Sequence, residues 1–458
     1  MNRLTKLSIG LIFLLMISIF TISCDEEYID TTETTLNEET SESDIIESDM
    51  IESESIIYPH DEVVEVNIDI SDTNYQDLIE NALDEKYYSC DITYNGYTLS
   101  NVAIRTKGNS SLRDVFNSGV DRFSYNIDLN YYENQDLFGI DKLILNNLFE
   151  DPTMMVEYFT YEALESLDVV SSRTTFVELY INGIYYGLYL SVEHVGNEFL
   201  DAYFGDSDGE MYKPEIGVGA NLNYLTDYTD YNALINKNSD DMSNENIIEL
   251  MERIESGENL DEIFNVESYL KYLAVSTYTV NLDSYQGGMF HNYYLYNYDG
   301  VFQWITWDIN MAFNGFPGAA MPDSKAVQYL IDEPVVNSMS SYPLIETILA
   351  NETYLELYHS YLQELITGYF DYATFEQRVL EVYELIDEYV ANDTNSFYTY
   401  TEFQSAVLTS SSTSYSILQF VEERNLNVAS QLSGDLPSTN SGLGNIVDGQ
   451  KPNQPPRR

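Results

Sequence analysis

The spacing between apolar residues changes along this chain, and that change restricts the fold more than any other feature. Residues 63–70 alternate between apolar and polar, as a strand with one buried face does, and residues 121–132 alternate again. Residues 247–254 and 266–277 carry apolar side chains at the spacing of one helical face, and further helices are expected between 344 and 430. A β-rich half followed by an α-rich half predicts an α+β fold with a cleft between two lobes.

Two hairpins and one helix start are marked by individual residues. Asn182-Gly183 and Asp299-Gly300, each between two apolar runs, are strong signals for a two-residue hairpin turn. A helix is expected with Asp151 as its N-cap and Pro152 at its first position, because those residue types suit those places. Its apolar face recurs every four residues at Met155, Phe159, Ala163 and Leu167.

The charge balance excludes one class of partner. Asp and Glu total 77 against 19 Lys and Arg, so the formal net charge is −58. Such a surface repels phosphates, and no nucleic-acid partner is expected. It attracts basic partners and raises their rate of encounter. Adaptation to a salty environment, where self-repulsion is screened, is a second interpretation that does not exclude the first.

The N-terminus has the pattern of an exported lipoprotein. Two basic residues precede an apolar run at 7–22, and Thr21-Ile22-Ser23-Cys24 is similar to a lipobox, in which Cys24 takes a diacylglyceryl anchor to the membrane. Ordinary cleavage and an uncleaved N-terminal anchor are the alternatives, and in each case the bulk of the protein is exported. The other cysteine, Cys90, is expected to be a buried apolar residue.

Composition divides the chain into five parts. Residues 1–24 form the lipoprotein-type signal peptide, and residues 25–58, rich in Glu, Asp, Ser and Thr, form an acidic disordered tether. The N-lobe is expected at 59–192 and the C-lobe at 193–432. Residues 433–458, rich in Ser, Gly, Asn and Pro, are expected to form a disordered tail.

Three polar residues of the second half carry the main chemical signal. Asp283 follows a predicted helix, Asn292 opens the second hairpin and Asp308 closes it. With Asp299-Gly300 as the turn, Asn292 falls opposite Trp307, beside Asp308, and a shift by one residue sets it directly against Asp308. Either register joins an amide oxygen to a carboxylate, a hard oxygen site of the kind Mg²⁺ prefers, with Asp283 nearby to orient a hydroxyl.

This order of residues is that of a protein kinase. There, a catalytic Asp accepts the proton of the substrate hydroxyl, and an Asn and a later Asp hold the metal ions. The spacing differs, because Asn292 lies nine positions after Asp283 (292 − 283) instead of five. Taken singly, Asp283 suits a loop after a helix and Asp308 suits a turn, so the ordered set is what favours chemistry.

A glycine-containing loop is a candidate for phosphate binding. In Arg105-Thr106-Lys107-Gly108-Asn109-Ser110-Ser111 the glycine lets the backbone approach a phosphate closely, and the two basic residues add charge that is scarce in this chain. A polar turn between strands is the alternative. Residues 189–195 occupy the place where a kinase-like order puts the link between lobes that faces an adenine, and the alternative there is a strand leaving its sheet.

Together these motifs resemble the spore coat protein H (CotH) kinase family, in the family's order and over roughly residues 60 to 430. The loop at 105–111 is similar to the signature R-x-K/R-G-N-S-S/T, and residues 180–193 are similar to Y-I-N-G-x-Y-x-G-L-Y-x-x-x-E. The other matching segments are Arg122–Ile127, Leu143–Asn147, Asp151–Met154, Asn281–Asp283, Asn292–Tyr296 and Trp307-Asp308.

The resemblance implies a two-lobed, atypical protein-kinase-like fold that uses ATP and Mg²⁺ to phosphorylate Ser-rich proteins, in some members spore coat proteins. By position, Asp283 resembles the catalytic Asp, and Asp308 and Asn292 resemble metal ligands. Arg122 takes the place of a phosphate-contacting Lys, with Glu157 as its ion-pair partner, while Glu193 lies at the inter-lobe hinge. The implied nucleotide-binding residues are Arg105, Lys107, Gly108, Asn109, Ser110, Ser111, Arg122, Glu157 and Glu193.

Three departures from the family pattern bear on catalytic rate more than on nucleotide binding. Arg122 stands where Lys is usual, Val156 where many members carry a basic residue, and Asn310 where an Asp is common.

Three functions are left open: a Ser/Thr kinase acting on a basic, Ser-rich protein, a kinase-fold adhesin or scaffold without phosphotransfer, and an unrelated solute-binding lipoprotein, which the intact motifs disfavour. The expected location is the cell surface or spore coat.

Overall fold

The computed structural model describes residues 55–227, 230–238, 245–316, 321–410 and 414–445. All of them belong to one compact unit of the chain. The expected signal peptide with Cys24, the tether up to residue 54 and the end of the tail lie outside the described residues. No helix in the described part of the chain is long and apolar enough to cross a membrane.

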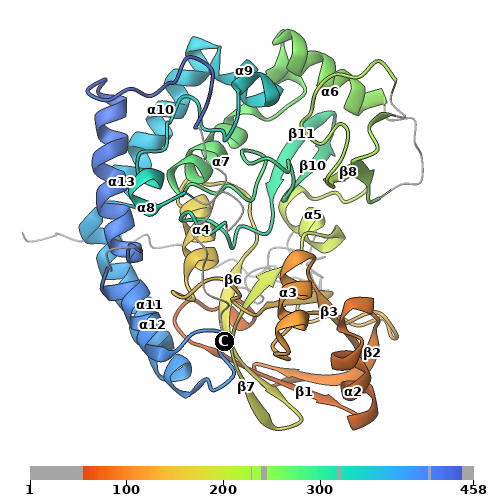
Figure 1. Cartoon of the computed structure of the whole chain (residues 1–458). Helices are drawn as coiled ribbons and strands as arrows, with labels where there is room; N and C mark the ends of the chain where they lie inside the picture. The colour runs from red at the N-terminus through yellow and green to blue at the C-terminus, as the bar shows by residue number, and fades with distance from the viewer. Residues whose placement is uncertain (1–54, 228–229, 239–244, 317–320, 411–413, 446–458) are drawn as a thin grey trace, which may run out of the picture. The chain divides into compact units, whose positions relative to one another are not determined.

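The β-rich first half forms a closed barrel with the strand order β1-β2-β3-β4-β5-β7-β6 (Figure 1). The sheet closes because β1 pairs in parallel with β6, which sets Val64 opposite Val177 and Ile68 opposite Ile181. Every second residue of β1 is buried, as expected for a strand whose inner face fills a core. The expected burial of Cys90, on β2, is confirmed. The strands are β1 (Val64–Ile70), β2 (Tyr88–Tyr94), β3 (Tyr97–Lys107), β4 (Ser124–Asp128), β5 (Lys142–Asn146), β6 (Thr174–Ile181) and β7 (Ile184–Glu193).

Three helices interrupt the strands of the barrel: α2 (Asp72–Glu80), α3 (Ser110–Ser118) and α4 (Val156–Glu165). The predicted start of α4 was wrong by several residues, because Met154 has a positive φ of 61° and a helix cannot run through it. Asp151 nevertheless caps the helix from a distance, since its Oδ2 accepts a hydrogen bond of 2.8 Å from the backbone N–H of Val156.

Both predicted hairpins are confirmed, with the registers that two-residue turns impose. At Asn182-Gly183 and Asp299-Gly300 all four φ angles are positive, between 49° and 84°, as a type I′ turn requires. Tyr298 therefore pairs with Val301, and the remaining pairs of that hairpin follow in step. This register decides which residues meet at its open end.

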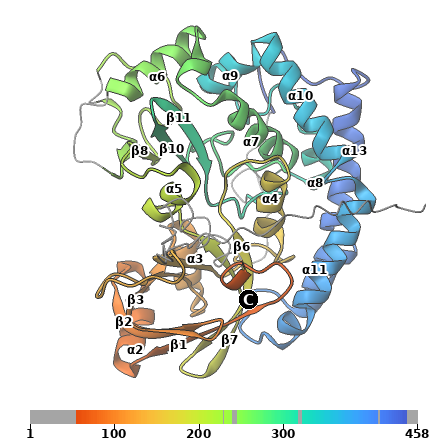
Figure 2. The same cartoon turned by 180° about the vertical axis from the view of Figure 1, so that it is seen from behind.

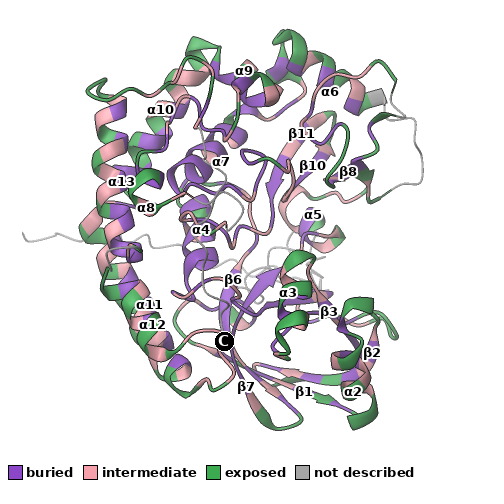
Figure 3. Cartoon of the chain, viewed as in Figure 1, coloured by how far each residue is buried: buried purple, intermediate pink, exposed green. Residues whose placement is uncertain are grey.

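The second half of the chain consists of an antiparallel sheet, β11-β10-β8-β9, and most of the helices. The apolar stripe predicted at 247–254 is fully buried on α6. Figure 3 shows α7, β10 and β11 as largely buried elements, whereas α11 and α13 alternate buried and exposed residues. The bounds are α5 (Asn197–Phe204), β8 (Met211–Pro214), β9 (Leu234–Asn236), α6 (Glu245–Ser256), α7 (Val266–Tyr278), β10 (Tyr293–Tyr298), β11 (Val301–Thr306), α8 (Asp323–Ala326), α9 (Pro343–Leu349), α10 (Glu352–Thr367), α11 (Tyr372–Asn392), α12 (Tyr400–Leu408) and α13 (Ile417–Leu432).

The long helices connect the two halves. Helix α13 packs against both α10 and α11, α10 packs against α7, and α11 also reaches β7 of the barrel (Figure 2). Buried Arg424 on α13 donates to the carbonyl oxygens of Thr277 and Tyr278, at distances of 3.0 and 3.1 Å. These two carbonyls are at the C-terminal end of α7, so α13 holds the segment that leads to Asp283.

The folded region extends beyond both of its predicted ends. Ile57 and Tyr58, assigned to the tether, are fully buried, and the Tyr94 hydroxyl donates to the Ile57 carbonyl at 2.8 Å. In the predicted tail, the backbone N–H groups of Gly442 and Gly444 donate to the Glu333 carboxylate at 2.6 and 2.9 Å. A polar composition indicated disorder there, but these backbone groups find partners in a distant loop.

Candidate active site

Asp283, Asn292 and Asp308 meet at the open end of the β10–β11 hairpin. Helix α7 ends at Tyr278, just before Asp283, while Asn292 directly precedes β10 and Asp308 follows β11. The backbone N–H of Trp307 donates to the Asn292 carbonyl at 3.2 Å, so of the two registers considered, the one that sets Asn292 opposite Trp307 is confirmed.

The Asn292 amide binds the two aspartates together. Its Nδ2 donates to the Asp283 carbonyl at 2.7 Å, to Asp283 Oδ2 at 3.2 Å and to the Asp308 carbonyl at 3.4 Å. His291, whose role was not foreseen, places Nε2 2.9 Å from Asp283 Oδ1. With Nδ2 committed, the Asn292 Oδ1 accepts no hydrogen bond from the described residues and is available to a ligand.

The backbone at this point is strained. Asn292 and Asp308 have φ angles of 63° and 54°, in the left-handed region that residues other than glycine rarely adopt. Val280, a β-branched residue between α7 and Asp283, has a φ of 51°. Such outliers cost on the order of 1–3 kcal/mol each and are common where side chains are held for function. Positive φ angles at Val280, Asn292 and Asp308 make this loop a candidate functional one.

The glycine-containing loop is a tight turn that leads into the N-terminus of α3, which makes it a candidate anion-binding turn. Strand β3 ends at Lys107, Gly108 adopts a φ of 122°, and α3 begins at Ser110. Asn109 precedes the helix without capping it through its side chain, so the first N–H groups of α3 remain for a ligand. A Cβ on Gly108 would lie 3.0 Å from Ser111 Oγ, so glycine is required for this close turn.

Lys107 is connected to Glu157 through one amide. The Lys107 Nζ donates to Asn146 Oδ1 at 2.7 Å, and Asn146 Nδ2 donates to Glu157 Oε2 at 2.8 Å. Burial lowers the pKa of Lys107, although the carboxylates of Asp308 and Glu157 act in the opposite direction. Burial, with the Asp308 charge, raises the pKa of Glu157 to about 7. A partly buried lysine and a buried glutamate with shifted pKa values, beside an aspartate, are typical of a functional site.

Arg122 does not take part in this site, contrary to the expectation. It is fully buried, and its guanidinium forms an ion pair of 2.6 Å with Asp393 and donates to the carbonyls of Asn147 and Leu188. Because its donors are used in this way, Arg122 cannot contact a phosphate or pair with Glu157. Lys107 occupies the position expected for the cationic partner of Glu157.

Glu193 is also committed elsewhere. Its carboxylate pairs with Arg173 at 2.5 Å and accepts a hydrogen bond from the Tyr203 hydroxyl at 3.1 Å. The next residue, His194, faces the site instead, and burial together with nearby lysines lowers its pKa to about 3. His194 is therefore neutral at any physiological pH. Segment 189–195 does reach the site, but through a different residue from the one predicted.

The remaining candidate residues surround one cavity of about 340 Å³. That volume lies in the range of small-molecule pockets. Its cations are Arg105, Lys107 and Lys213, the last of which carried no motif and was missed. The predicted lining residues are Arg105, Lys107, Gly108, Asn109, Ser110, Ser111, Glu157, Asp283, Asn292 and Asp308, and those added by the structure include Asn146, His194, Lys213, Glu215, His291, Tyr294 and Trp307.

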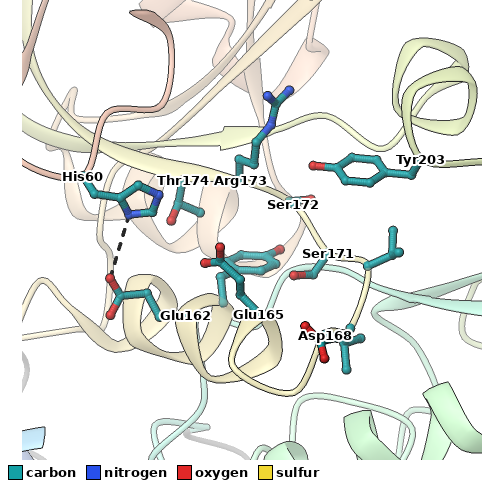
Figure 4. A pocket seen from close by; sticks show the side chains of 12 residues that line it. His60, Glu162, Glu165, Asp168, Ser171, Ser172, Arg173, Thr174 and Tyr203 are labelled. Atoms are coloured by element: carbon teal, nitrogen blue, oxygen red, sulfur yellow. Dashed lines mark ion pairs between the residues drawn. The ribbon is translucent and has the colours of Figure 1, made fainter. Parts of the chain in front are cut away.

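A second cavity, of about 310 Å³, lies beside α4 and β6 and has a different character (Figure 4). Glu162, Glu165 and Asp168 line it, and its Arg173 is already paired with Glu193. His60 faces Glu162 there, with Nδ1 3.9 Å from Oε1. None of the predicted site residues lines this second cavity, whereas ten of them line the first, so the first cavity is the candidate active site.

The first cavity fits a magnesium ion that is bound together with phosphate. Among the described residues no group of three or more His, Cys, Asp and Glu side chains is placed to hold a metal alone. Asp308 and the Asn292 Oδ1 provide hard oxygen atoms, and Mg²⁺ is commonly bound by one or two carboxylates plus substrate phosphates and water. The three cations and the anion-binding turn suit those phosphates.

Fold and site together define an α+β protein in which a barrel and a helical part frame a polar cavity with a candidate anion-binding turn, three cations, and the positive φ angles of Asn292 and Asp308. The chain belongs to the CotH family, because the model of the family described as "CotH kinase protein" matches residues 104–428. The chain is also 23% identical, over 294 aligned residues, to the inner spore coat protein H of Bacillus subtilis (strain 168). The aligned region covers 60% of this chain and 76% of that protein.

Proposed function

We propose that this protein is an ATP- and Mg²⁺-dependent kinase that transfers phosphate to Ser or Thr of a basic, Ser-rich protein, with the barrel as the N-lobe and the helical part as the C-lobe of a kinase-like fold. One observation carries the proposal. Three segments far apart in sequence, 105–111, 146–157 and 283–308, bring their predicted groups to one cavity. Membership of a family described as a kinase supports it.

Each group has a role in this proposal. The Asp308 carboxylate and the Asn292 Oδ1 would hold Mg²⁺, which supplies neutralisation of phosphate charge when bound. The turn at Gly108 and the Lys107 ammonium orient the phosphates. Asp283, held by His291 and Asn292, accepts the proton of the substrate hydroxyl. Glu157 keeps Lys107 in place through Asn146.

The place of action is part of the same proposal. The name of the Bacillus subtilis relative, inner spore coat protein H, supports a role at the spore coat. The lipobox-like segment ending at Cys24 supports attachment to a membrane through a lipid.

The test is transfer of radiolabel from ATP by the purified full chain, in the presence of Mg²⁺, to a basic Ser-rich peptide. Asp283→Asn and Asp308→Asn are each expected to reduce the rate by about 10²–10⁴-fold. Asp299→Asn is the matched control, because Asp299 is exposed at the tip of the same hairpin and Asn suits its turn. Equal rates in all four proteins would refute the assigned roles.

The second candidate is a kinase-fold adhesin or scaffold without phosphotransfer. It is favoured by Asn310, which lines the cavity where the family commonly has an Asp, so that one carboxylate is absent. This candidate predicts ATP binding that weakens in Asp308→Asn, with no transfer to any peptide. Isothermal titration of ATP with the same four proteins shows whether nucleotide binds, and the radiolabel assay then separates the two candidates by the presence or absence of transfer.

A further inference from the structure

A groove with an aromatic wall lies on the outer side of the barrel, apart from the candidate active site. It has a volume of about 780 Å³, larger than a single side chain needs. Tyr87 and Tyr132 line it on one side, and Asp72, Asp77 and Glu80 of α2 line it on another. Both kinds of residue are available to a partner of suitable chemistry.

Tyr87 and Tyr132 of the groove are joined by the ring of Tyr131, which does not itself line the groove. The Tyr131 ring lies 4.6 Å from that of Tyr87 and 4.8 Å from that of Tyr132, between ring centroids. Tyr131 is 52% exposed and Tyr132 is 43% exposed, which is unusual for rings that make ring–ring contacts. Exposed clusters of this kind commonly mark an interaction site.

The chain already places its own cations against these rings. The Arg105 guanidinium lies 5.4 Å from the Tyr87 ring centroid, and the Lys86 ammonium lies 4.6 Å from that of Tyr88. The π faces of this surface are therefore accessible to positive charge at distances that give a cation–π attraction.

The charge of the groove also favours a positively charged partner. Three carboxylates and one ammonium line it, so its formal charge is −2 (−3 + 1). Lys86 pairs with Asp77 at 3.0 Å, which leaves Asp72 and Glu80 without an ion pair among the described residues. Lys and Arg side chains can form cation–π contacts with the rings and ion pairs with these carboxylates.

One stretch of the chain borders both the groove and the candidate active site. Glu85 lines the cavity, and the next two residues, Lys86 and Tyr87, line the groove. Arg105, which also lines the cavity, pairs with Glu85 and lies against Tyr87. A polypeptide held in the groove therefore has neighbouring residues close to the cavity.

We propose that this groove, lined by Tyr87, Tyr132 and the acids of α2 and adjoined by Tyr131, binds a Lys- and Arg-rich segment of a polypeptide substrate. As a docking site for a substrate, it rests on the proposed function. Rings and carboxylates hold the basic side chains, and an adjacent serine of the same polypeptide reaches the cavity.

The first experiment measures binding without ATP. A short fluorescent peptide with Lys and Arg flanking a serine, and a matched peptide with Gln in place of each basic residue, are titrated with the full chain by anisotropy. Tyr131→Ala/Tyr132→Ala is expected to weaken binding of the basic peptide by about five- to tenfold. Asp72→Asn/Glu80→Gln is expected to weaken it similarly and to reduce its salt dependence.

Tyr298→Ala is the matched control, since Tyr298 is 37% exposed at the tip of the β10–β11 hairpin, outside the groove. Unchanged affinity in the double tyrosine variant, or equal binding of both peptides, would overturn the groove as a basic-peptide site.

The second experiment measures phosphate transfer to the two peptides. The tyrosine variant is expected to raise KM for the basic peptide about five- to tenfold at unchanged kcat, and to leave the Gln peptide unaffected. If no protein transfers phosphate but basic-peptide binding still depends on the tyrosines, the kinase proposal fails and the groove stands. A tyrosine variant that lowers kcat equally for both peptides would overturn a docking role.

Discussion

Arg122→Met is expected to destabilise the protein without removing a nucleotide contact. The Arg122 and Asp393 side chains are 1% and 2% exposed, and they join the loop before β4 to the end of α11 at 2.6 Å. Breaking a buried pair by removing one partner costs about 3–5 kcal/mol. Asp393 also accepts a hydrogen bond of 3.1 Å from the Leu188 N–H, which partly compensates its charge. We therefore expect the lower end, about 3 kcal/mol.

Urea unfolding followed by tyrosine and tryptophan fluorescence measures this loss. With a slope of about 3 kcal/mol per molar, the midpoint falls by about 1 M. Arg122→Met/Asp393→Leu removes both charges and is expected to recover most of the stability, because no charge remains buried and unpaired. Lys107→Met provides the contrast, with a loss of about 1 kcal/mol from one hydrogen bond and a large loss of ATP affinity.

A comparison of Arg122→Met with Lys107→Met thus separates a loss of stability from a loss of ATP binding. A midpoint for Arg122→Met within error of the wild type, together with lost ATP binding, would refute the structural role assigned to Arg122. It would return that residue to the phosphate-contacting role that the family resemblance implied.

Three further outcomes are expected. Gly108→Ala strains a φ of 122° and brings its Cβ to 3.0 Å from Ser111 Oγ, so ATP affinity measured by titration calorimetry falls at least about tenfold. Burial raises the pKa of Glu157 from its ordinary 4.5 to about 7, so the folded protein keeps a proton that the unfolded chain releases. The Glu157 carboxyl therefore lowers the free energy of unfolding as pH rises from 4.5 to 7. The urea midpoint of Glu157→Gln should fall less over that pH range than the midpoint of the wild type. Arg424→Met removes a donor from four carbonyls, of which those of Tyr278 and Val327 have no other donor among the described residues, and should cost about 3 kcal/mol by the same urea measurement, with a loss below 1 kcal/mol contradicting it.

The sequence by itself determined the local geometry of the site. Asn-Gly and Asp-Gly turns admit one short hairpin with one register, so the meeting of Asn292 with Trp307 and Asp308 followed from counting residues back from Asp299-Gly300. The period of apolar residues located α6 and α7 for a similar reason, because a helix must bury one continuous face. The alternation along β3 also places Arg105 and Lys107 on one face.

The tertiary structure alone decided which charges reach the cavity. Arg122 and Glu193 are polar residues in the expected segments, but their partners are Asp393, which is distant in sequence, and Arg173, which directly precedes the neighbouring strand β6, and no local pattern reports such pairs. Closure of the barrel through β1 and β6 and the docking of residues 442–444 on Glu333 depend in the same way on contacts across the fold. A buried charge must find a counter-charge or hydrogen-bond partners, and only the assembled fold determines where these lie.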